Sequence, residues 1–481
     1  MFFIMRLPDK KLIRPASAAL LVFILSACMV GPEHLNPGVA PPGTFKYAAS
    51  PHQTLAAPLS GKWWERFEDA TLNRLVEAAM TDNYELAASA HRITQARAIA
   101  RASRSDLFPA LSADPGYARR GVSETIETNQ GGTFTTWTAP LNVAYEFDLF
   151  GRIRSGYAAS LADAEAVVED DNGLRLILQS EIAVTYFAMR AFDDDIRIVS
   201  RTIEVRRESL TILKNRHMLG VISRLPVARA EAELRATEAL LLSLQRDRTL
   251  LENAVATLLG KTPVELSLAP APLDNPPPDM PSVLPSVLLI ARPDIRRAER
   301  IMAAENARVG VAAAALYPQV TLGANIGYSS TRASDLFDAR SFAWGILPNI
   351  HIPLFEGGRN IAELERARAR YAEMYAAYRQ TIVQAFGEVE DALVSVSLLE
   401  RQQRANEQAV QSADEAYRLS MEQFEGGLVD YLSVLDAERT LLDNLLLKTR
   451  LRGQRYLSAV ALVKAIGGSW ETEPGRSLSR Y

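Results

Sequence analysis

The chain has 481 residues, of which 53 are basic and 57 acidic, so its formal net charge is −4, and 48% of its residues are hydrophobic. This composition excludes an intrinsically disordered chain and a collagen-like chain. It also lacks the concentrated positive charge that nucleic acid phosphates attract, so we expect no nucleic-acid partner. Length alone leaves open whether the chain forms several domains or one extended architecture.

The N-terminus has the pattern of a secretory signal peptide. Basic residues precede an apolar run of about 13 residues, Pro15 to Ala27, which is too short to cross a bilayer as a helix. The run ends in Leu25-Ser26-Ala27-Cys28, which resembles the bacterial lipobox, where the cysteine becomes the lipidated first residue after cleavage.

Cys28 is the one cysteine of the sequence, so it cannot form an intramolecular disulfide or a thiolate metal cluster. We predict a signal peptide over residues 1–27 and a covalent lipid on Cys28, which favours membrane attachment. The alternative is a buried or unused thiol. Met29 comes next, and lipoproteins retained in the inner membrane carry aspartate there, so resemblance to lipoproteins implies sorting to the outer membrane.

The second half of the chain repeats the plan of the first. Matching residues recur about 207 positions apart, which indicates an internal duplication. The pairs are Phe108-Pro109 with Tyr317-Pro318, Phe150-Gly151 with Phe355-Glu356-Gly357, Gly220 with Gly427, Glu231 with Glu438, and Gly260 with Gly467. We therefore divide the chain into a signal peptide (1–27), a lipidated N-terminal segment ending in the first helix (28–107), a first repeat (108–261), a proline-rich linker (262–285), a second repeat (286–468) and a C-terminal tail (469–481).

In each repeat the sequence predicts a helix, two strands, a very long helix, a glycine turn and another long helix. Alternating apolar and polar residues predict strands at 111–117, 141–149, 319–328 and 341–354, and the first of these patterns is the weakest. Proline-free runs with apolar residues three or four apart predict helices over Arg152–Met218 and Asn360–Phe424. Helices of this length are typical of coiled-coil packing.

The four strands have one lipid-compatible face and one polar face, the pattern of an outer-membrane β-barrel. Four strands cannot close alone, because an open sheet edge in hydrocarbon leaves unpaired backbone groups. Three copies in a ring would supply twelve strands, an even number within the known range of barrels. The alternative is a small periplasmic sheet with one buried face.

In these features the chain resembles the outer-membrane efflux proteins of the TolC type, and within them the lipidated NodT or OprM-like group. The resemblance covers nearly the whole chain, although each motif alone is weak. The matching stretches are Leu25-Ser26-Ala27-Cys28, Trp63-Trp64, Gln95-Ala96-Arg97-Ala98, Leu107-Phe108-Pro109, Phe147-Asp148-Leu149-Phe150-Gly151, Ile352-Pro353-Leu354-Phe355 and Asp430-Tyr431-Leu432-Ser433-Val434-Leu435-Asp436-Ala437.

The resemblance implies a mixed α and β membrane protein that forms a homotrimer in the outer membrane of a Gram-negative bacterium. Its twelve-stranded transmembrane β-barrel, with four strands from each chain, would continue into a long periplasmic α-helical barrel of coiled coils with an equatorial belt. Such a duct passes drugs or other small toxic solutes from an inner-membrane pump of the RND type, through a periplasmic adaptor, to the exterior. Trp63, Trp64 and Tyr84 are then expected to pack in the equatorial region.

The resemblance also gives roles to the turns between the long helices. The turn Leu219-Gly220-Val221-Ile222-Ser223 and the turn Gly426-Gly427-Leu428-Val429 would face the periplasm and contact the adaptor. Gly220 and Gly427 also suit a helix C-cap, and the two interpretations are compatible.

A periplasmic gate is expected just beyond the second turn. Leu432 and Asp436 lie four residues apart and so share a helix face, where each could form a ring in a trimer. Three close carboxylates would raise one another's pKa and make the constriction sensitive to pH and cations. The alternative is that Asp430 caps the helix and Asp436 is an ordinary surface charge.

One residue departs from the pattern of many relatives. Pro226 stands where they have an acidic residue, so an ion-pair lock that uses this carboxylate is not expected here.

The sequence offers no catalytic residues. Gly260-Lys261-Thr262 resembles the end of a phosphate-binding loop, but Val255 and Pro263 break that motif. The five histidines lack metal-ligand spacing. We therefore expect no enzyme activity and no cofactor or metal apart from the lipid on Cys28. Two other functions remain open, namely the outer-membrane duct of a type I protein or peptide secretion system and a periplasmic lipoprotein scaffold of coiled coils.

Overall fold

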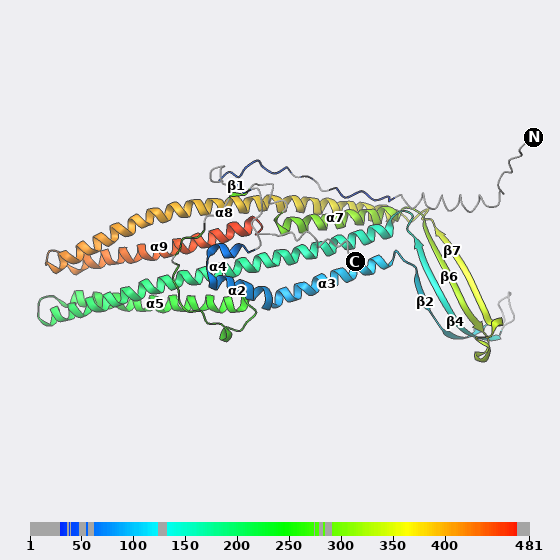
Figure 1. Cartoon of the computed structure of the whole chain (residues 1–481), viewed down its shortest axis with the longest axis horizontal. Coiled ribbons are helices and arrows are strands. Elements are labelled where there is room, and N and C mark those ends of the chain that lie inside the picture. The colour runs from blue at the N-terminus through cyan, green and yellow to red at the C-terminus, as the bar shows by residue number, and fades with distance from the viewer. Residues whose placement is uncertain are drawn as a thin grey trace, which may run out of the picture. The chain divides into compact units, whose positions relative to one another are not determined.

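The structure is a computed structural model that describes residues 29–35, 38, 40–47, 54–55, 62–123, 132–273, 275–278, 282–283 and 291–468. The predicted signal peptide 1–27, the lipidation residue Cys28 and the C-terminal tail 469–481 lie outside these residues. The helices α2 to α9 and the strands β1 to β7 follow the chain order of Figure 1.

Five strands form one antiparallel sheet. They are β2 (Ala110–Ala113), β3 (Gly116–Val122), β4 (Gly132–Phe147), β6 (Gln319–Ser330) and β7 (Phe342–His351). The spatial order is β2, β4, β6, β7, and β3 also pairs with β4. β2 and β3 share one register against β4, with Ala113 opposite Leu141 and Gly116 opposite Thr138, so they act as one strand interrupted at Asp114-Pro115. The sheet therefore has four strand positions.

The strand positions agree with the alternating sequence patterns, but of the predicted bounds only the start at Gln319 is reproduced, and the largest differences lie in the first two strands. The first strand is broken because Pro115 has no N–H to donate to the ladder. β4 begins at Gly132, nine residues before the predicted start at 141, because Thr133, Thr135 and Thr136 extend the strand without the apolar alternation. Pro348 lies within β7, which is an edge strand in this chain and so tolerates a missing donor.

The long helices form two hairpins of equal construction (Figure 1). α4 (Arg152–Met218) and α5 (Arg224–Leu258) make the first, and α8 (Arg359–Glu425) and α9 (Tyr431–Ala465) make the second. Each repeat also has a shorter helix before its strands, α3 (Tyr84–Ser105) and α7 (Pro293–Ala314), while α2 (Ala70–Asp82) precedes α3. α4 has the predicted bounds and α8 is one residue longer at each end.

Glycines set the junctions between the elements. Gly151, at the start of α4, and Gly220 and Gly427, after α4 and α8, have φ values of 81°, 72° and 77°. Only glycine adopts this left-handed conformation without steric cost, which is why the sequence places glycine there in both repeats.

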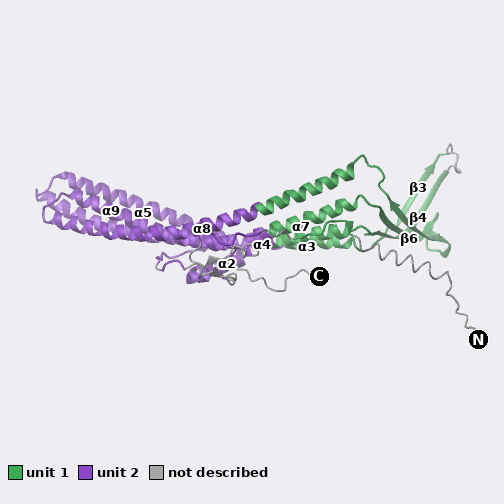
Figure 2. Cartoon of the chain, turned by 90° about the horizontal axis from the view of Figure 1, so that it is seen from above, with its two compact units in different colours: residues 1–38, 92–168, 297–379 green, residues 39–91, 169–296, 380–481 purple. Residues whose placement is uncertain are grey.

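The chain divides into two compact units (Figure 2). Unit 1 contains residues 1–38, 92–168 and 297–379, which include the sheet, and unit 2 contains residues 39–91, 169–296 and 380–481, which include both hairpin turns. The helices α3, α4, α7 and α8 contribute residues to both units. None of the described helices combines the length and apolar composition that crossing a bilayer requires.

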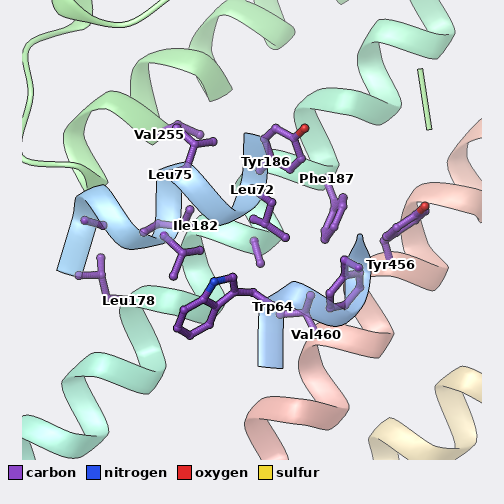
Figure 3. Packing of buried hydrophobic residues seen from close by; sticks show 14 of the residues in the cluster. Trp64, Leu72, Leu75, Leu178, Ile182, Tyr186, Phe187, Val255, Tyr456 and Val460 are labelled. Carbon is purple, nitrogen blue, oxygen red and sulfur yellow. The ribbon is translucent and has the colours of Figure 1, made fainter. Parts of the chain in front are cut away.

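The main core lies in unit 2, where α2 and the short helix η2 (Trp63–Phe67) pack against α4, α5 and α9. Figure 3 shows side chains of this core, among them Trp64, Leu72, Phe187 and Tyr456, which come from these elements. Trp63 is buried and its indole N–H donates to Gln179 at 3.1 Å. The tryptophans thus pack as expected, whereas the expectation for Tyr84 is wrong, since its side chain is 77% exposed in this chain.

Part of the proline-rich linker is held to unit 2 by polar contacts. Arg190 donates to the carbonyl oxygen of Ala269 at 2.6 Å, and the buried carboxylate of Asp193 accepts from the backbone N–H of Ala271 at 3.1 Å. Two short strands of two residues each, β1 (Thr54–Leu55) and β5 (Ser282–Val283), pair with each other in parallel. The described linker residues near Ala269 and Ala271 are therefore fixed to α4.

Candidate functional site

The first hairpin turn, residues 219–223, is an exposed cap on α4. The backbone N–H of Gly220 donates to the carbonyl of His217, and that of Val221 donates to the carbonyl of Arg216, both at 2.9 Å. This is the glycine cap that the sequence suggested as one interpretation. Leu219 is 80% exposed and Val221 is also exposed, so the turn presents apolar side chains to its surroundings.

The second hairpin turn, residues 426–429, repeats this geometry. The N–H of Gly427 donates to Phe424 at 3.1 Å, and the N–H of Leu428 donates to Gln423 at 2.9 Å. Leu428 is 79% exposed. Both turns combine a glycine cap with an exposed leucine. The internal duplication is therefore visible in the turns as well as in the helices. Ile222, Ser223, Gly426 and Val429 complete the two turns.

The two residues predicted to form a gate lie at the start of α9. Asp430 is the N-cap of this helix, and its carboxylate accepts from the N–H of Ser433 at 3.2 Å. Leu432 is 37% exposed, and the side chain of Asp436 is 64% exposed with Arg439 Nη1 at 3.9 Å. Both therefore lie on an accessible part of α9, while Val434 and Leu435 are buried.

Sequence reasoning missed a buried ionic network directly behind this region. Arg206 of α4 is only 4% exposed, and its Nε donates to Glu438 of α9 at 2.9 Å. Its Nη1 donates to the backbone oxygen of Glu233 of α5 at 3.1 Å and to Thr237. Glu233 in turn accepts from Arg439 of α9. One arginine thus joins α4, α5 and α9, which come from both repeats.

The network also perturbs titratable groups nearby. The hydrogen bond from Arg439 holds the pKa of Glu233 below its ordinary value although partial burial opposes this. Burial, assisted by the negative charge of Glu438, raises the pKa of Tyr431 to about 12. Glu233 and Tyr431 therefore keep a single charge state near neutral pH, the carboxylate ionised and the phenol neutral.

Pro226 is accommodated without strain, since it is the third residue of α5 and no intrahelical partner exists there for a backbone N–H. In the described part of the chain no group of three or more His, Cys, Asp or Glu side chains is arranged to hold a metal ion.

The family model and the most similar relatives agree on one protein family. The family model described as "Outer membrane efflux protein" matches residues 75–261 and 284–468, one segment for each repeat. The pyoverdine export outer membrane protein OpmQ of Pseudomonas aeruginosa is 32% identical over 457 residues, which cover 94% of this chain and 96% of that protein. The outer membrane protein OprJ of the same species is 32% identical over 96% of this chain and 97% of its own length.

Solved structures have the same fold. The outer-membrane channel OprN superposes with a TM-score of 0.87 and 30% identity, covering 92% of this chain and all of that one. The outer membrane protein VceC of Vibrio cholerae superposes with a TM-score of 0.81 and 33% identity, covering 86% of this chain and all of that one. The similarity therefore extends over the sheet and both hairpins.

Proposed function

Because the chain belongs to the outer membrane efflux protein family, we propose that three copies of it form a duct through which drugs or other small toxic solutes leave the cell. The resemblance and the fold class predicted from the sequence are confirmed. The protein is an exit channel of an efflux system in the Gram-negative outer membrane, where a β-barrel continues into a helical barrel. A channel of this kind needs no catalytic residue and, in our proposal, no cofactor beyond its lipid.

The observation that carries the homotrimer is the incompleteness of the sheet. Within the described residues, β2 and β3 at one edge and β7 at the other have no outer neighbour. Apolar side chains of β7, such as Trp344, Ile346 and Ile350, are exposed in the single chain. Open edges and an exposed apolar face are unstable in a membrane, and both are removed when copies of the chain close a barrel.

The partners proposed at the other end are a periplasmic adaptor and an inner-membrane pump of the RND type. Exposed apolar side chains grouped at a surface commonly mark a protein interface. The turns 219–223 and 426–429 each present such side chains, Leu219, Val221 and Leu428. This pattern supports the assignment of both turns as adaptor contacts.

The lipid on Cys28 remains a proposal, and the described residues that follow it support the anchor. The N–H of Val30 donates to the carbonyl of Phe150 at 3.4 Å, beside the junction of β4 and α4. A Cβ at Gly151 would lie only 2.6 Å from Met29 Cγ, so Met29 packs directly on this glycine. Met29 and Val30 therefore lie at the junction of β4 and α4, where the membrane surface is expected.

The experiment that tests the function is deletion of the gene followed by complementation. Susceptibility to a panel of antibiotics and solvents is expected to rise in the deletion strain and to return with the intact gene. Unchanged susceptibility together with loss of an exported protein or peptide would instead favour the type I secretion alternative. The relatives of this chain include a toluene efflux pump outer membrane protein and a pyoverdine export outer membrane protein, so the panel includes a solvent and a siderophore.

The gate assignment predicts the conductance of the reconstituted channel. Asp436→Ala is expected to raise single-channel conductance severalfold in planar bilayers, because shorter side chains widen a constriction and remove its ring of carboxylates. Asp414→Ala, at an exposed position of α8, serves as the matched control and should leave conductance unchanged. Equal conductance of Asp436→Ala and the unmodified protein would remove the gate assignment.

A further inference from the structure

The two faces of the sheet differ in chemistry, and the strand register assigns each residue to one of them. Cross-strand neighbours share a face and alternate residues along a strand change face. On one face the rows include Leu141 opposite Ile326 and Tyr145 opposite Leu322, and on the other Asn142 opposite Asn325 and Glu146 opposite Thr321. The first is the face that meets lipid in a barrel, and the second lines the lumen.

Aromatic side chains gather on the lipid face near one end of the sheet. Tyr117 of β3 lies opposite Trp137 of β4 with ring centroids 4.6 Å apart. Tyr328 of β6 lies opposite Phe342 of β7 with centroids 5.9 Å apart, and Phe337 contacts Tyr328 at 5.5 Å. Aromatic residues in this arrangement mark the level of the lipid headgroups.

Arginines lie just beyond these aromatic residues. Arg119 follows Tyr117 by two residues on the same face of β3, opposite Thr135. Arg332 comes two residues after Ser330, the last residue of β6, and Arg340 comes two residues before Phe342, the first residue of β7. All three are exposed, and within the described residues only Arg340 has an acidic partner, Asp338 at 3.1 Å.

This end of the sheet faces the outer leaflet of the membrane. The helices α3, α4, α7 and α8 adjoin the opposite ends of the strands, near residues 110, 147, 319 and 351. In the function proposed above these helices extend into the periplasm, so Val122 at the end of β3 and Ser330 at the end of β6 lie on the outer side of the bilayer. This orientation rests on the proposed outer-membrane channel and holds whatever solute and partners the channel has.

We propose that Arg119, Arg332 and Arg340 bind the phosphate groups of the phosphorylated glycolipid of the outer leaflet, lipid A. An aromatic belt fixes the headgroup level, and an arginine just outside it places its guanidinium where anionic phosphates lie. Guanidinium binds phosphate through paired, charge-assisted hydrogen bonds. In a trimer each chain contributes these three arginines, so the glycolipid sites form a ring around the barrel.

The test uses the purified full-length protein in nanodiscs that contain either bis-phosphorylated lipid A or its dephosphorylated form. Native mass spectrometry counts the lipid A retained per protein. Arg119→Gln combined with Arg332→Gln is expected to weaken retention about fivefold per arginine, and Arg119→Lys is expected to keep most of it. Arg120→Gln is the matched control, because Arg120 lies opposite Phe134 on the lumenal face of the same strand.

Four outcomes would overturn the proposal. The variant with both Arg119→Gln and Arg332→Gln would retain as much lipid A as the unmodified protein, or Arg120→Gln would lose as much lipid as that variant. Dephosphorylated lipid A would be retained as well as the bis-phosphorylated form, or inorganic phosphate would bind the protein as tightly as the lipid. Far-UV circular dichroism of each variant excludes loss of fold as the cause of weaker retention.

Discussion

Replacing Arg206 by alanine is expected to destabilise the protein by about 3–5 kcal/mol, because the change leaves a carboxylate buried without its partner. Arg206 of α4 donates to Glu438 of α9 and to the backbone of Glu233 of α5, so it links all three helices. The loss should appear as a lower apparent midpoint of thermal unfolding, followed by far-UV circular dichroism.

Two controls separate this effect from ordinary charge removal. Arg201→Ala removes an exposed arginine of the same helix, whose partner Glu204 lies 3.2 Å away, and should change stability by less than about 0.5 kcal/mol. Arg206→Met combined with Glu438→Leu removes both buried charges and should recover much of the lost stability. A single variant as stable as the unmodified protein would mean that the network contributes nothing to the packing of the two repeats.

Replacing Phe187 by alanine should have an effect of similar size, about 3–5 kcal/mol, through a cavity in the main core. Phe187 is 1% exposed, and its ring centroid lies 5.0 Å from that of Phe67 of η2 and 4.4 Å from that of Tyr456 of α9. Figure 3 labels Phe187 and Tyr456 in this core. Its loss therefore weakens the contact of η2 with both long hairpins at once.

The matched controls are one conservative and one exposed substitution. Phe187→Leu keeps an apolar side chain in the core and should cost clearly less than alanine. Tyr84→Ala removes an aromatic ring that is already 77% exposed, so its effect on the unfolding midpoint should be small. If Phe187→Ala and Tyr84→Ala had equal effects, the core would not lie where the structure places it.

The helices were the most predictable part of the fold. Long proline-free runs between glycines leave few choices, which is why Arg152–Met218 is recovered as α4 and the second long helix differs by single residues. The strand β4 was less predictable, since its threonine-rich start at Thr133 gives no apolar alternation although threonine favours strands. The alternation of apolar and polar residues predicts which face of the sheet each residue lies on, but it predicts the first and last residues of a strand less well.

The functional residues divide in a similar way. The glycine turns could be predicted because left-handed backbone requires glycine. The role of Arg206 could not, because a buried arginine and the surface arginines of a long helix look alike in the sequence. Tyr84 was expected to pack and is exposed, because the sequence shows that a residue is aromatic but not which helix faces it. The role of Leu432 and Asp436 as a gate stays a prediction, because a ring of side chains around the axis of a trimer forms only between copies of the chain.

The most direct measurement of the central claim is the mass and conductance of the purified protein in lipid. A chain whose described residues form four strand positions with two open sheet edges is expected to be a trimer by native mass spectrometry and to give ion-conducting channels in planar bilayers. A monomer that leaves the bilayer insulating would contradict the account, because then the sheet edges must be covered without copies of the chain.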